Sequence, residues 1–290
     1  MAGLMSRIEQ NRSRFSKSQN KIANYITTHY DKAAFMTAIK LGEAVGVSES
    51  TVVRFAYLVG MDGYPELQTA MQEMMRNHLT MAQRLKMTVS VNESKIPKTV
   101  LKNNIANLRH TQEVFDEDIF RNSVHEICEA RKIYVFGTKN LYAVASFLKD
   151  GLNYIHDNCI LIDSAKESAF EDMVDIGPYD VCIAFGFPRI SALFVEIIHF
   201  AKSKGAKIIS VTDSAGSSVG VLSDFVLLSS TDNMTSFMDS CVGPLCIADM
   251  LIASTAKKRS EEAMDRISAL EQVWSKNDIF LKDNSTEKRK

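Results

Sequence analysis

Hydroxyl side chains and an arginine are closely spaced in the stretch VGVSESTVVRF, residues 45–55. Ser48, Ser50 and Thr51 are short enough to bind a phosphate oxygen or the edge of a base at close range. Arg54 follows Thr51 by about one helical turn, and its guanidinium matches a guanine edge or a phosphate. The pattern favours contact with DNA. The alternative is that the neighbouring apolar side chains form a core and these polar ones only face water.

Two short helices are predicted around this stretch. Apolar residues recur at every third or fourth position from Lys17 to about Leu79, which is typical of helices. The first helix covers residues 37–45, the second opens at Ser48, and Gly46 lies in the break between them. Ser48 suits the N-cap of the second helix. Two helices joined in this way form a helix-turn-helix, whose second helix enters the major groove with its first turn facing the DNA.

Five apolar, β-branched runs occupy the second half of the chain: KIYVFG, NCILID, DVCIAFG, AKIISVTD and DFVLLSS. Because these runs do not alternate with polar residues, they fit strands that are buried on both faces. Helical stretches at 141–154, 166–174 and 190–204 separate them, and this order predicts a parallel sheet with helices on both sides. Two closing helices are expected at 236–257 and 259–274.

Cationic residues occur in the loops after two of these runs. Lys139 lies in GTKNLYAVA after the first strand, where the free N–H groups of a helix start suit an anion. Arg189 lies in GFPRISALF after the third strand, and its guanidinium is a bidentate partner for a phosphate or a carboxylate. Ligands of an open parallel sheet bind beyond the carboxyl ends of its strands, so both residues are candidate ligand contacts. The alternatives are that Lys139 is simply exposed and that Arg189 pairs with Glu196 or Asp213.

Hydroxyls and carboxylates form a third candidate region. Thr212 and Asp213 end the fourth predicted strand, where ligand contacts are expected. Ser236, Asp239 and Ser240 open the predicted helix 236–257, and a hydroxyl-rich helix start at the sheet crevice suits a polar ligand. The alternative is helix capping, with Ser236 at the N-cap, and both roles are compatible.

An aldose–ketose isomerase needs a general base beside the substrate carbon, usually a glutamate or a histidine. The candidates in the α/β half are His156, His199, Glu167 and Glu171. The sequence shows no orienting partner for any of them, so it favours ligand sensing over catalysis, without a cofactor.

The chain has 290 residues, of which 46% are hydrophobic and 24% charged, with a net charge of −1, which predicts two packed domains. Basic residues are concentrated in residues 1–21, as in a DNA-binding end or a solvated terminus. Five cysteines without CxxC spacing argue against a disulfide frame or a zinc site. The sequence shows neither a signal peptide nor an apolar run of ~18 residues, so we expect a cytoplasmic protein with no membrane segment.

VGVSESTVVRFAYLVGMDGYPELQ resembles the amino-terminal domain of RpiR-type bacterial transcriptional regulators, whose hallmarks are V-S-x-x-T-V-V-R-F and a following G-x-x-G-[FY]-x-x-[LF]. The resemblance covers about residues 4–78 and implies binding to a DNA operator. Members of the family usually carry a basic residue just after the arginine–phenylalanine pair, whereas Ala56 and Tyr57 follow here. This departure implies fewer phosphate contacts and a flatter salt dependence, by ~0.9 log units for each phosphate that is not bound.

Residues 125–257 are similar to the sugar isomerase (SIS) domain that RpiR-type regulators carry behind the helix-turn-helix. In that family the domain senses a phosphosugar or a related metabolite through loops at the carboxyl ends of strands. The usual G-x-G-x-S of the first loop keeps Gly137 but has Lys139 in place of the second glycine. Of the usual hydroxyls in the second loop only Ser191 remains. FPR-x-S and SF-x-DS-x-x-x-PL resemble a recurrent variant within the family, in which Arg189 stands in for several hydroxyls.

We therefore expect an all-α helix-turn-helix domain at residues 1–79, a linker at 80–96, and a SIS-type α/β domain at 97–274, before a polar tail at 275–290. The α/β domain should be doubly wound and flavodoxin-like, with three layers around a parallel sheet. The expected function is that of a homodimeric or dimer-of-dimers regulator that binds double-stranded DNA and a phosphosugar or sugar-acid effector. The alternatives are a sugar-phosphate isomerase and a regulator whose SIS domain only dimerises.

The predicted DNA contacts are Lys40, Ser48, Glu49, Ser50, Thr51, Arg54 and Tyr57. The predicted effector contacts are Gly137, Thr138, Lys139, Asn140, Gly186, Phe187, Pro188, Arg189, Ser191, Thr212, Asp213, Ser236, Asp239 and Ser240.

Overall fold

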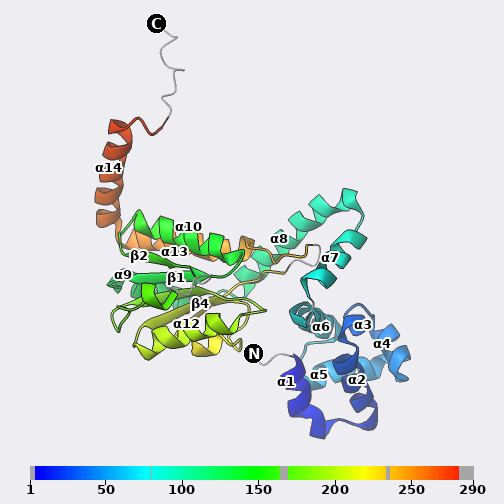
Figure 1. The fold of residues 1–290 in the computed structure, drawn as a ribbon. Helices are drawn as coiled ribbons and strands as arrows, with labels where there is room; N and C mark the ends of the chain where they lie inside the picture. Colours follow the sequence, from blue (N-terminus) through cyan, green and yellow to red (C-terminus); the bar gives the residue numbers. More distant parts are fainter. Residues whose placement is uncertain (1–3, 79, 164–168, 233–235, 281–290) are drawn as a thin grey trace. The chain divides into compact units, whose positions relative to one another are not determined.

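The computed structural model describes residues 4–78, 80–163, 169–232 and 236–280. The chain divides into two compact units, Met1–Asn103 with Asp232–Asp239, and Asn104–Thr231 with Ser240–Lys290. The first unit is helical and the second is α/β, which confirms the predicted fold class (Figure 1).

The helical unit consists of helices, and side chains between Leu4 and Met71 form its hydrophobic core. Its elements are α1 Leu4–Asn11, η1 Arg12–Arg14, α2 Lys17–Thr28, α3 Tyr30–Ala33, α4 Ala38–Val45, α5 Glu49–Leu58, α6 Tyr64–His78, α7 Met81–Ser90 and η2 Glu93–Lys95. Ile22, Leu41 and Phe55 come from α2, α4 and α5 and are fully buried. The rings of Phe15 and Phe55 lie 5.3 Å apart, which ties the start of α2 to the middle of α5.

The predicted linker at residues 80–96 contains a helix, α7. Thr80 opens it with a capping box: its Oγ1 accepts the Gln83 N–H at 3.2 Å, while the Gln83 side chain accepts the Thr80 N–H at 2.8 Å. The next long helix, α8 Ile96–Glu113, then crosses the division between the units. The sequence shows no clear helical pattern at α7 because the described side chains of this helix, apart from Arg84, are exposed or half-buried.

The α/β unit alternates strands and helices. Its elements after α8 are α9 Glu117–Glu129, β1 Ile133–Gly137, α10 Leu141–Asn153, β2 Cys159–Ile162, α11 Ala169–Asp172, β3 Val181–Phe185, α12 Ala192–Ser203, β4 Lys207–Thr212, η3 Gly220–Leu222, β5 Phe225–Leu228, α13 Val242–Lys258 and α14 Ser260–Lys276. The strands form one parallel sheet in the order β2-β1-β3-β4-β5, with Gly137 of β1 opposite Phe185 of β3.

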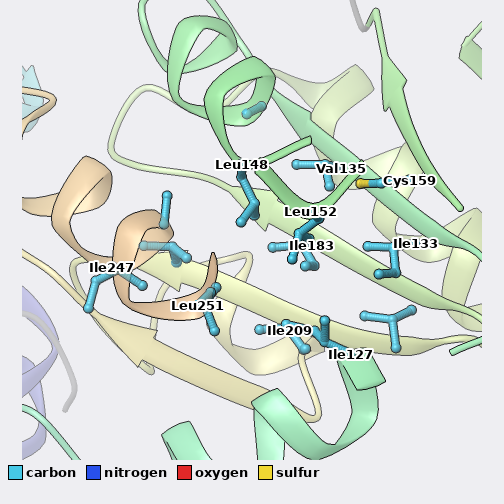
Figure 2. Packing of buried hydrophobic residues seen from close by; sticks show 14 of the residues in the cluster. Ile127, Ile133, Val135, Leu148, Leu152, Cys159, Ile183, Ile209, Ile247 and Leu251 are labelled. Carbon is cyan, nitrogen blue, oxygen red and sulfur yellow. The ribbon is translucent and has the colours of Figure 1, made fainter. Parts of the chain in front are cut away.

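Apolar side chains fill both faces of this sheet. On one face, Ile127 of α9, Leu148 of α10 and Leu251 of α13 pack with strand residues such as Ile183 (Figure 2). On the other face, side chains of α11 and α12 pack on the sheet, and the ring of Phe194 lies 4.5 Å from that of Phe136. The sheet is therefore the middle of three layers, as predicted.

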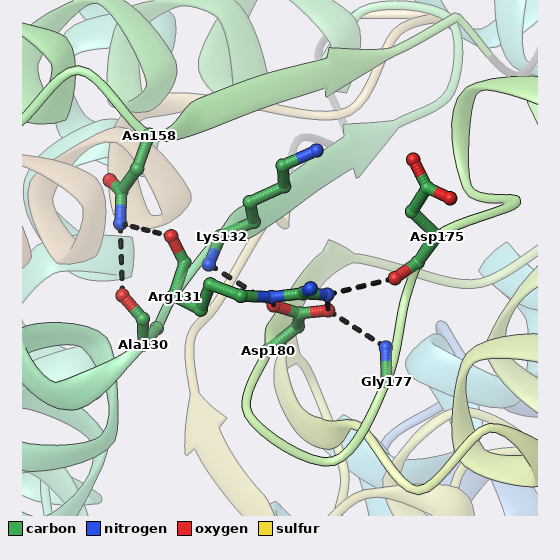
Figure 3. Close-up of polar contacts among 7 residues, drawn as sticks. All are labelled: Ala130, Arg131, Lys132, Asn158, Asp175, Gly177 and Asp180. Carbon is green, nitrogen blue, oxygen red and sulfur yellow. Dashed lines mark hydrogen bonds and ion pairs between the residues drawn. The ribbon is translucent and has the colours of Figure 1, made fainter.

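Asp180 joins the amino ends of β1 and β3. Its carboxylate accepts hydrogen bonds from Arg131 Nε at 2.9 Å and Nη2 at 2.7 Å, from Lys132 N at 3.1 Å and from Gly177 N at 2.7 Å (Figure 3). Arg131 also donates to the Asp175 carbonyl at 2.8 Å. Burial disfavours the ionised carboxylate, but the bonds from Arg131 and Gly177 outweigh it and hold the pKa of Asp180 below its ordinary value. This cluster fixes the edge of the sheet that lies opposite the candidate effector site.

The predicted start of helix α13 was wrong. The sequence indicated a helix at 236–257, whereas α13 begins at Val242, so Ser236, Asp239 and Ser240 precede it. Pro244 explains the difference, because a proline deep inside a helix lacks the N–H for the ladder and clashes with the carbonyl four residues earlier. Pro244 instead lies in the first turn of α13, where neither problem arises.

Candidate DNA interface and effector site

The chain reverses tightly between α4 and α5. Gly46 has the left-handed φ of 70° that ends α4, and Ser48 caps α5 by accepting the Thr51 N–H at 3.3 Å, as predicted. A Cβ on Gly42 would lie 2.8 Å from the Val47 carbonyl oxygen, so α4 and the turn approach each other closely. Together these features build a compact helix-turn-helix.

The two faces of α5 differ. Val52, Phe55 and Ala56 are buried in the core, whereas Ser48, Ser50 and Arg54 are exposed and Thr51 is half-buried. The core that the alternative required is present, and the polar side chains are exposed or half-buried, so their contact with DNA stays a prediction. The Ser48 hydroxyl lies 2.9 Å from that of Ser50 and 2.8 Å from that of Thr51, so the first turn presents a cluster of hydroxyls. Lys40, Glu49 and Tyr57 are also exposed.

Tyr57 is the exposed member of the pair that departs from the RpiR pattern. Ala56 is completely buried, whereas 59% of Tyr57 is exposed. A basic side chain would fit at position 57 but not at position 56. The missing cation of the family pattern therefore corresponds to Tyr57.

Two cationic loops flank the point where the strand order reverses. The chain runs from β1 outward to β2 and then returns to β3 on the other side of β1, so the crevice of this sheet lies beyond the carboxyl ends of β1 and β3. Residues 138–140 follow β1 and residues 186–191 follow β3. Gly186 N donates to the Val211 carbonyl at 3.0 Å, which places the end of β4 beside the second loop.

Lys139 and Arg189 both adopt left-handed backbone conformations, with φ of 55° and 69°. Non-glycine residues rarely do so, and among the described residues only Asp278 joins them. Such strain of ~1–3 kcal/mol persists where the surroundings impose it, and it clusters at binding sites. The backbone at Lys139 thus keeps a conformation suited to the glycine it replaces. Both side chains are exposed at the sheet edge.

Several other predicted effector residues have structural partners. Ser191 caps α12 by accepting the Phe194 N–H at 3.2 Å. Thr212 is fully buried, and its hydroxyl donates to Asp213 and lies 3.2 Å from that of Ser217. Gly137, Gly186 and Phe187 are also buried, whereas Thr138, Asn140, Pro188 and Asp213 are half-buried. The structure therefore leaves Lys139 and Arg189 as the side chains most available to a ligand at this edge.

The segment before α13 is bound by polar side chains that the sequence analysis missed. Asn140 Nδ2 donates to Cys241 Sγ at 3.2 Å, which links the loop after β1 to the start of α13. The Ser240 hydroxyl donates to Asn104 Oδ1 at 2.7 Å, and Ser236 Oγ accepts the Met238 N–H at 3.2 Å. The signal in the sequence that could have identified Asn104 is the row of polar residues at helical spacing in KNNIANLRHT, residues 102–111.

Three of the four candidate bases for an isomerase lie within the described residues, each on or beside a different element. His156 precedes β2, at the amino edge of the sheet, 3.9 Å from Glu262, and burial lowers its pKa. It lines a hollow of about 530 Å³ together with Arg259 and Glu262, which pair with each other. His199 and Glu171 are exposed on α12 and α11, and Glu167 lies outside the described residues.

Within the described ranges, no group of three or more histidine, cysteine, aspartate or glutamate side chains is arranged to hold a metal ion. No helix in the described part of the chain is both long and apolar enough to cross a membrane.

The chain matches two family models. Residues 2–78 match the helix-turn-helix domain of the rpiR family, and residues 126–254 match the SIS domain. The HTH-type transcriptional regulator HexR of Pseudomonas aeruginosa is 24% identical over 268 residues, which cover 89% of this chain and 91% of that protein. HexR of Escherichia coli is 21% identical over 279 residues, which cover 93% of each.

Solved structures share the fold. The sugar isomerase domain of an RpiR transcription factor from Sphaerobacter thermophilus is 25% identical, with a TM-score of 0.59, over 61% of this chain and 99% of that chain. The Vibrio vulnificus NanR protein, solved in complex with ManNAc-6P, is 21% identical, with a TM-score of 0.58, over 94% of this chain and 98% of that chain.

Proposed function

Since this chain is a DNA-binding transcriptional regulator of the RpiR type, with a helix-turn-helix domain followed by a SIS domain, we propose that its SIS domain senses an anionic sugar derivative. The effector is a phosphosugar or a sugar acid, and its binding modulates the affinity for the operator. One observation carries the proposal: Lys139 and Arg189, both left-handed, lie on the two loops that flank the reversal of strand order.

Two cations on adjacent loops suit an anionic ligand better than a neutral sugar. A guanidinium binds phosphate or carboxylate through two parallel hydrogen bonds, and a lysine adds a compact charge. NanR, which shares the fold, was solved with an amino-sugar phosphate, ManNAc-6P. In the proposed mechanism, two copies of the chain read half-sites about 34 Å apart, and the effector shifts the pair between arrangements that do and do not match this spacing. A coupling of ~1–3 kcal/mol is sufficient for such a switch.

Binding is tested on the full chain by thermal unfolding with glucose 6-phosphate, ManNAc-6P, glucosamine 6-phosphate and gluconate. A ligand at about 100 times its dissociation constant should stabilise the SIS domain by ~2.7 kcal/mol. This stabilisation corresponds to a rise of roughly 5–10 °C in Tm. Arg189→Gly should abolish the rise, because it removes the guanidinium while glycine tolerates the left-handed backbone without strain.

The matched control is Lys207→Gln, which removes an exposed cation from the amino end of β4 in the same sheet. This variant should respond to the ligand as the wild type does. An undiminished rise in Arg189→Gly would refute a role for Arg189. Turnover of any of the phosphosugars by the wild type would instead favour the isomerase alternative.

Tyr57 stands at the position where the family pattern has a basic residue. Tyr57→Lys should restore the cation of the family pattern and bind one more phosphate per helix-turn-helix. The slope of log affinity against log salt should then steepen by ~0.9 for each additional phosphate bound, which titrations of a DNA duplex between low and moderate salt would measure. Tyr57→Gln, which adds no charge, should leave the slope unchanged; an equal slope in the lysine variant would show that position 57 does not reach the phosphates.

A further inference from the structure

The segment between β5 and α13 is shared between the two units. Asn104–Thr231 and the residues from Ser240 onward belong to the α/β unit, whereas Asp232–Asp239 belongs to the helical unit. The chain therefore passes between the units twice here, in addition to its passage within α8. We call residues 229–232 and 236–241 the β5–α13 connector.

In the helical unit, the connector is held by the linker helix α7. Arg84 Nη1 donates to Asp239 Oδ1 at 2.8 Å. The side chains of Arg84 and Asp239 are 8% and 24% exposed, so the pair is largely shielded from water. Among the α7 side chains that the structure describes, Arg84 is the one that is buried. The anchoring of α7 thus depends on the Arg84 guanidinium, and separating this charge from Asp239 costs free energy because the pair is largely buried.

In the α/β unit, the next residue of the connector is held by α8. The Ser240 hydroxyl donates to Asn104 Oδ1 at 2.7 Å, and Ser230 Oγ donates to Asn107 Oδ1 at 2.9 Å. Ser240 N donates to the Thr231 carbonyl at 3.0 Å, which closes the base of the connector. The Ser240 hydroxyl also accepts the Val242 N–H at 3.1 Å, so its donor and one of its two acceptor sites are used within the protein.

The third consecutive residue contacts the candidate effector site. Cys241 Sγ accepts a hydrogen bond from Asn140 at 3.2 Å, and Asn140 follows Lys139 directly. Asp239, Ser240 and Cys241 are thus bound in turn to α7, to α8 and to the loop of Lys139. Successive Cα atoms are only about 3.8 Å apart, so these three contacts lie within a very short path along the connector.

We propose that the Arg84–Asp239 pair is a latch that passes the state of the candidate effector site to the linker helix, and so to the DNA-binding unit. The proposal rests on the proposed function and deepens it: it names the regulation of that site. The sequence predicted Asp239 and Ser240 as effector contacts, but both side chains are bound within the protein, so in this scheme they are positioning residues. Lys139 and Arg189 hold the ligand.

Hydrogen exchange on the full, ligand-free chain tests the latch without any effector. Asp239→Asn and Arg84→Gln should each speed exchange of the α7 amides by about ten-fold or more, because they release the buried anchor of that helix. Asn140→Ala, at the far end of the relay, should also speed α7 exchange, by about three-fold or more. Asp249→Asn, which changes an exposed acid on α13, is the matched control and should leave α7 unchanged. Unchanged α7 exchange in Asp239→Asn or in Asn140→Ala would overturn the proposal.

A second readout separates the latch from a ligand contact. With the sugar phosphate that stabilises the wild type, Asp239→Asn should bind the ligand within about two-fold of the wild type. The same variant should lose most of the ligand-induced change in affinity for a selected operator duplex, a change of about 5-fold to 150-fold in the wild type. Loss of ligand binding, as expected for Arg189→Gly, would make Asp239 a ligand contact and overturn the latch. If no member of the panel binds the wild type, the proposed function fails, and the exchange data still decide whether the relay exists.

Discussion

Replacing Arg54 with alanine should lower the affinity for the operator by about five-fold to 150-fold per helix-turn-helix, since a bidentate contact between arginine and guanine contributes ~1–3 kcal/mol. Arg54 is exposed on α5, one turn after the hydroxyl cluster of Ser48, Ser50 and Thr51, and its neighbour Phe55 is buried. The fold should be unaffected, because the side chain contributes nothing to the core. The operator for this measurement is a duplex that the wild-type chain selects from a random library, and affinity is read by fluorescence anisotropy.

Two further variants show what Arg54 recognises. Arg54→Lys keeps the charge but loses the fork geometry, so it should bind almost as weakly as the alanine variant if Arg54 reads a base. If Arg54 contacts a phosphate instead, lysine should retain most of the affinity, and alanine should reduce the salt slope by ~0.9. Lys32→Ala, at an exposed cation on α3, is the control and should change affinity little. If Arg54→Ala bound the operator with the affinity of the wild type, α5 would not be part of the DNA interface.

Replacing Asp180 with alanine should destabilise the α/β unit by about 2–4 kcal/mol, since it leaves the N–H groups of Lys132 and Gly177 without their acceptor. Arg131 is half exposed and regains water when the carboxylate is lost, so its contribution to this cost is small. Chemical denaturation followed by far-ultraviolet circular dichroism would measure the change. Asp175→Asn is the control, because only the backbone carbonyl of Asp175 joins the cluster and the variant keeps it.

The same carboxylate makes stability depend on pH. The pKa of Asp180 in the folded chain lies below its ordinary value, so its ionised form stabilises the fold. That contribution is complete above the ordinary pKa of about 4 and is lost as the pH falls through the lower, folded-state value. Wild type should therefore lose stability over this acid range more steeply than Asp180→Asn. Parallel curves for the two proteins would show that Asp180 does not titrate as described.

Sequence patterns predicted most of the fold because the relevant signals are local. The hydroxyl at Ser48, followed by Val52 and Phe55 at core spacing, defined α5 and its cap. The β-branched runs defined all five strands, since the central strands β1, β3 and β4 are buried on both faces and the edge strands β2 and β5 are at least half-buried. The start of α13 was predicted too early because a hydroxyl-rich segment resembles a helix start, while Pro244 limits where the helix begins.

The features that distinguish the site depend on contacts between distant residues, which composition and periodicity do not report. The left-handed backbone at Lys139 and Arg189 is imposed by the loops around them. The sequence identified the cations but not their conformation. The bonds of Asp180 span 48 or 49 positions to Arg131 and Lys132, and no local pattern predicts them.

Arg84 and Asp239 are 155 positions apart: Arg84 precedes the residues that match the SIS domain, 126–254, and Asp239 lies inside that match, near its end. A chimera that grafts the helix-turn-helix and linker of one RpiR-type relative onto the SIS domain of another would therefore separate partners that are matched in this chain. Both halves of the chimera would fold. Position 84 would then carry the residue of one parent and position 239 the residue of the other. Exchange of regulatory and DNA-binding modules within this architecture thus requires the two positions to be transferred together, and in related chains their residue types should vary as a pair.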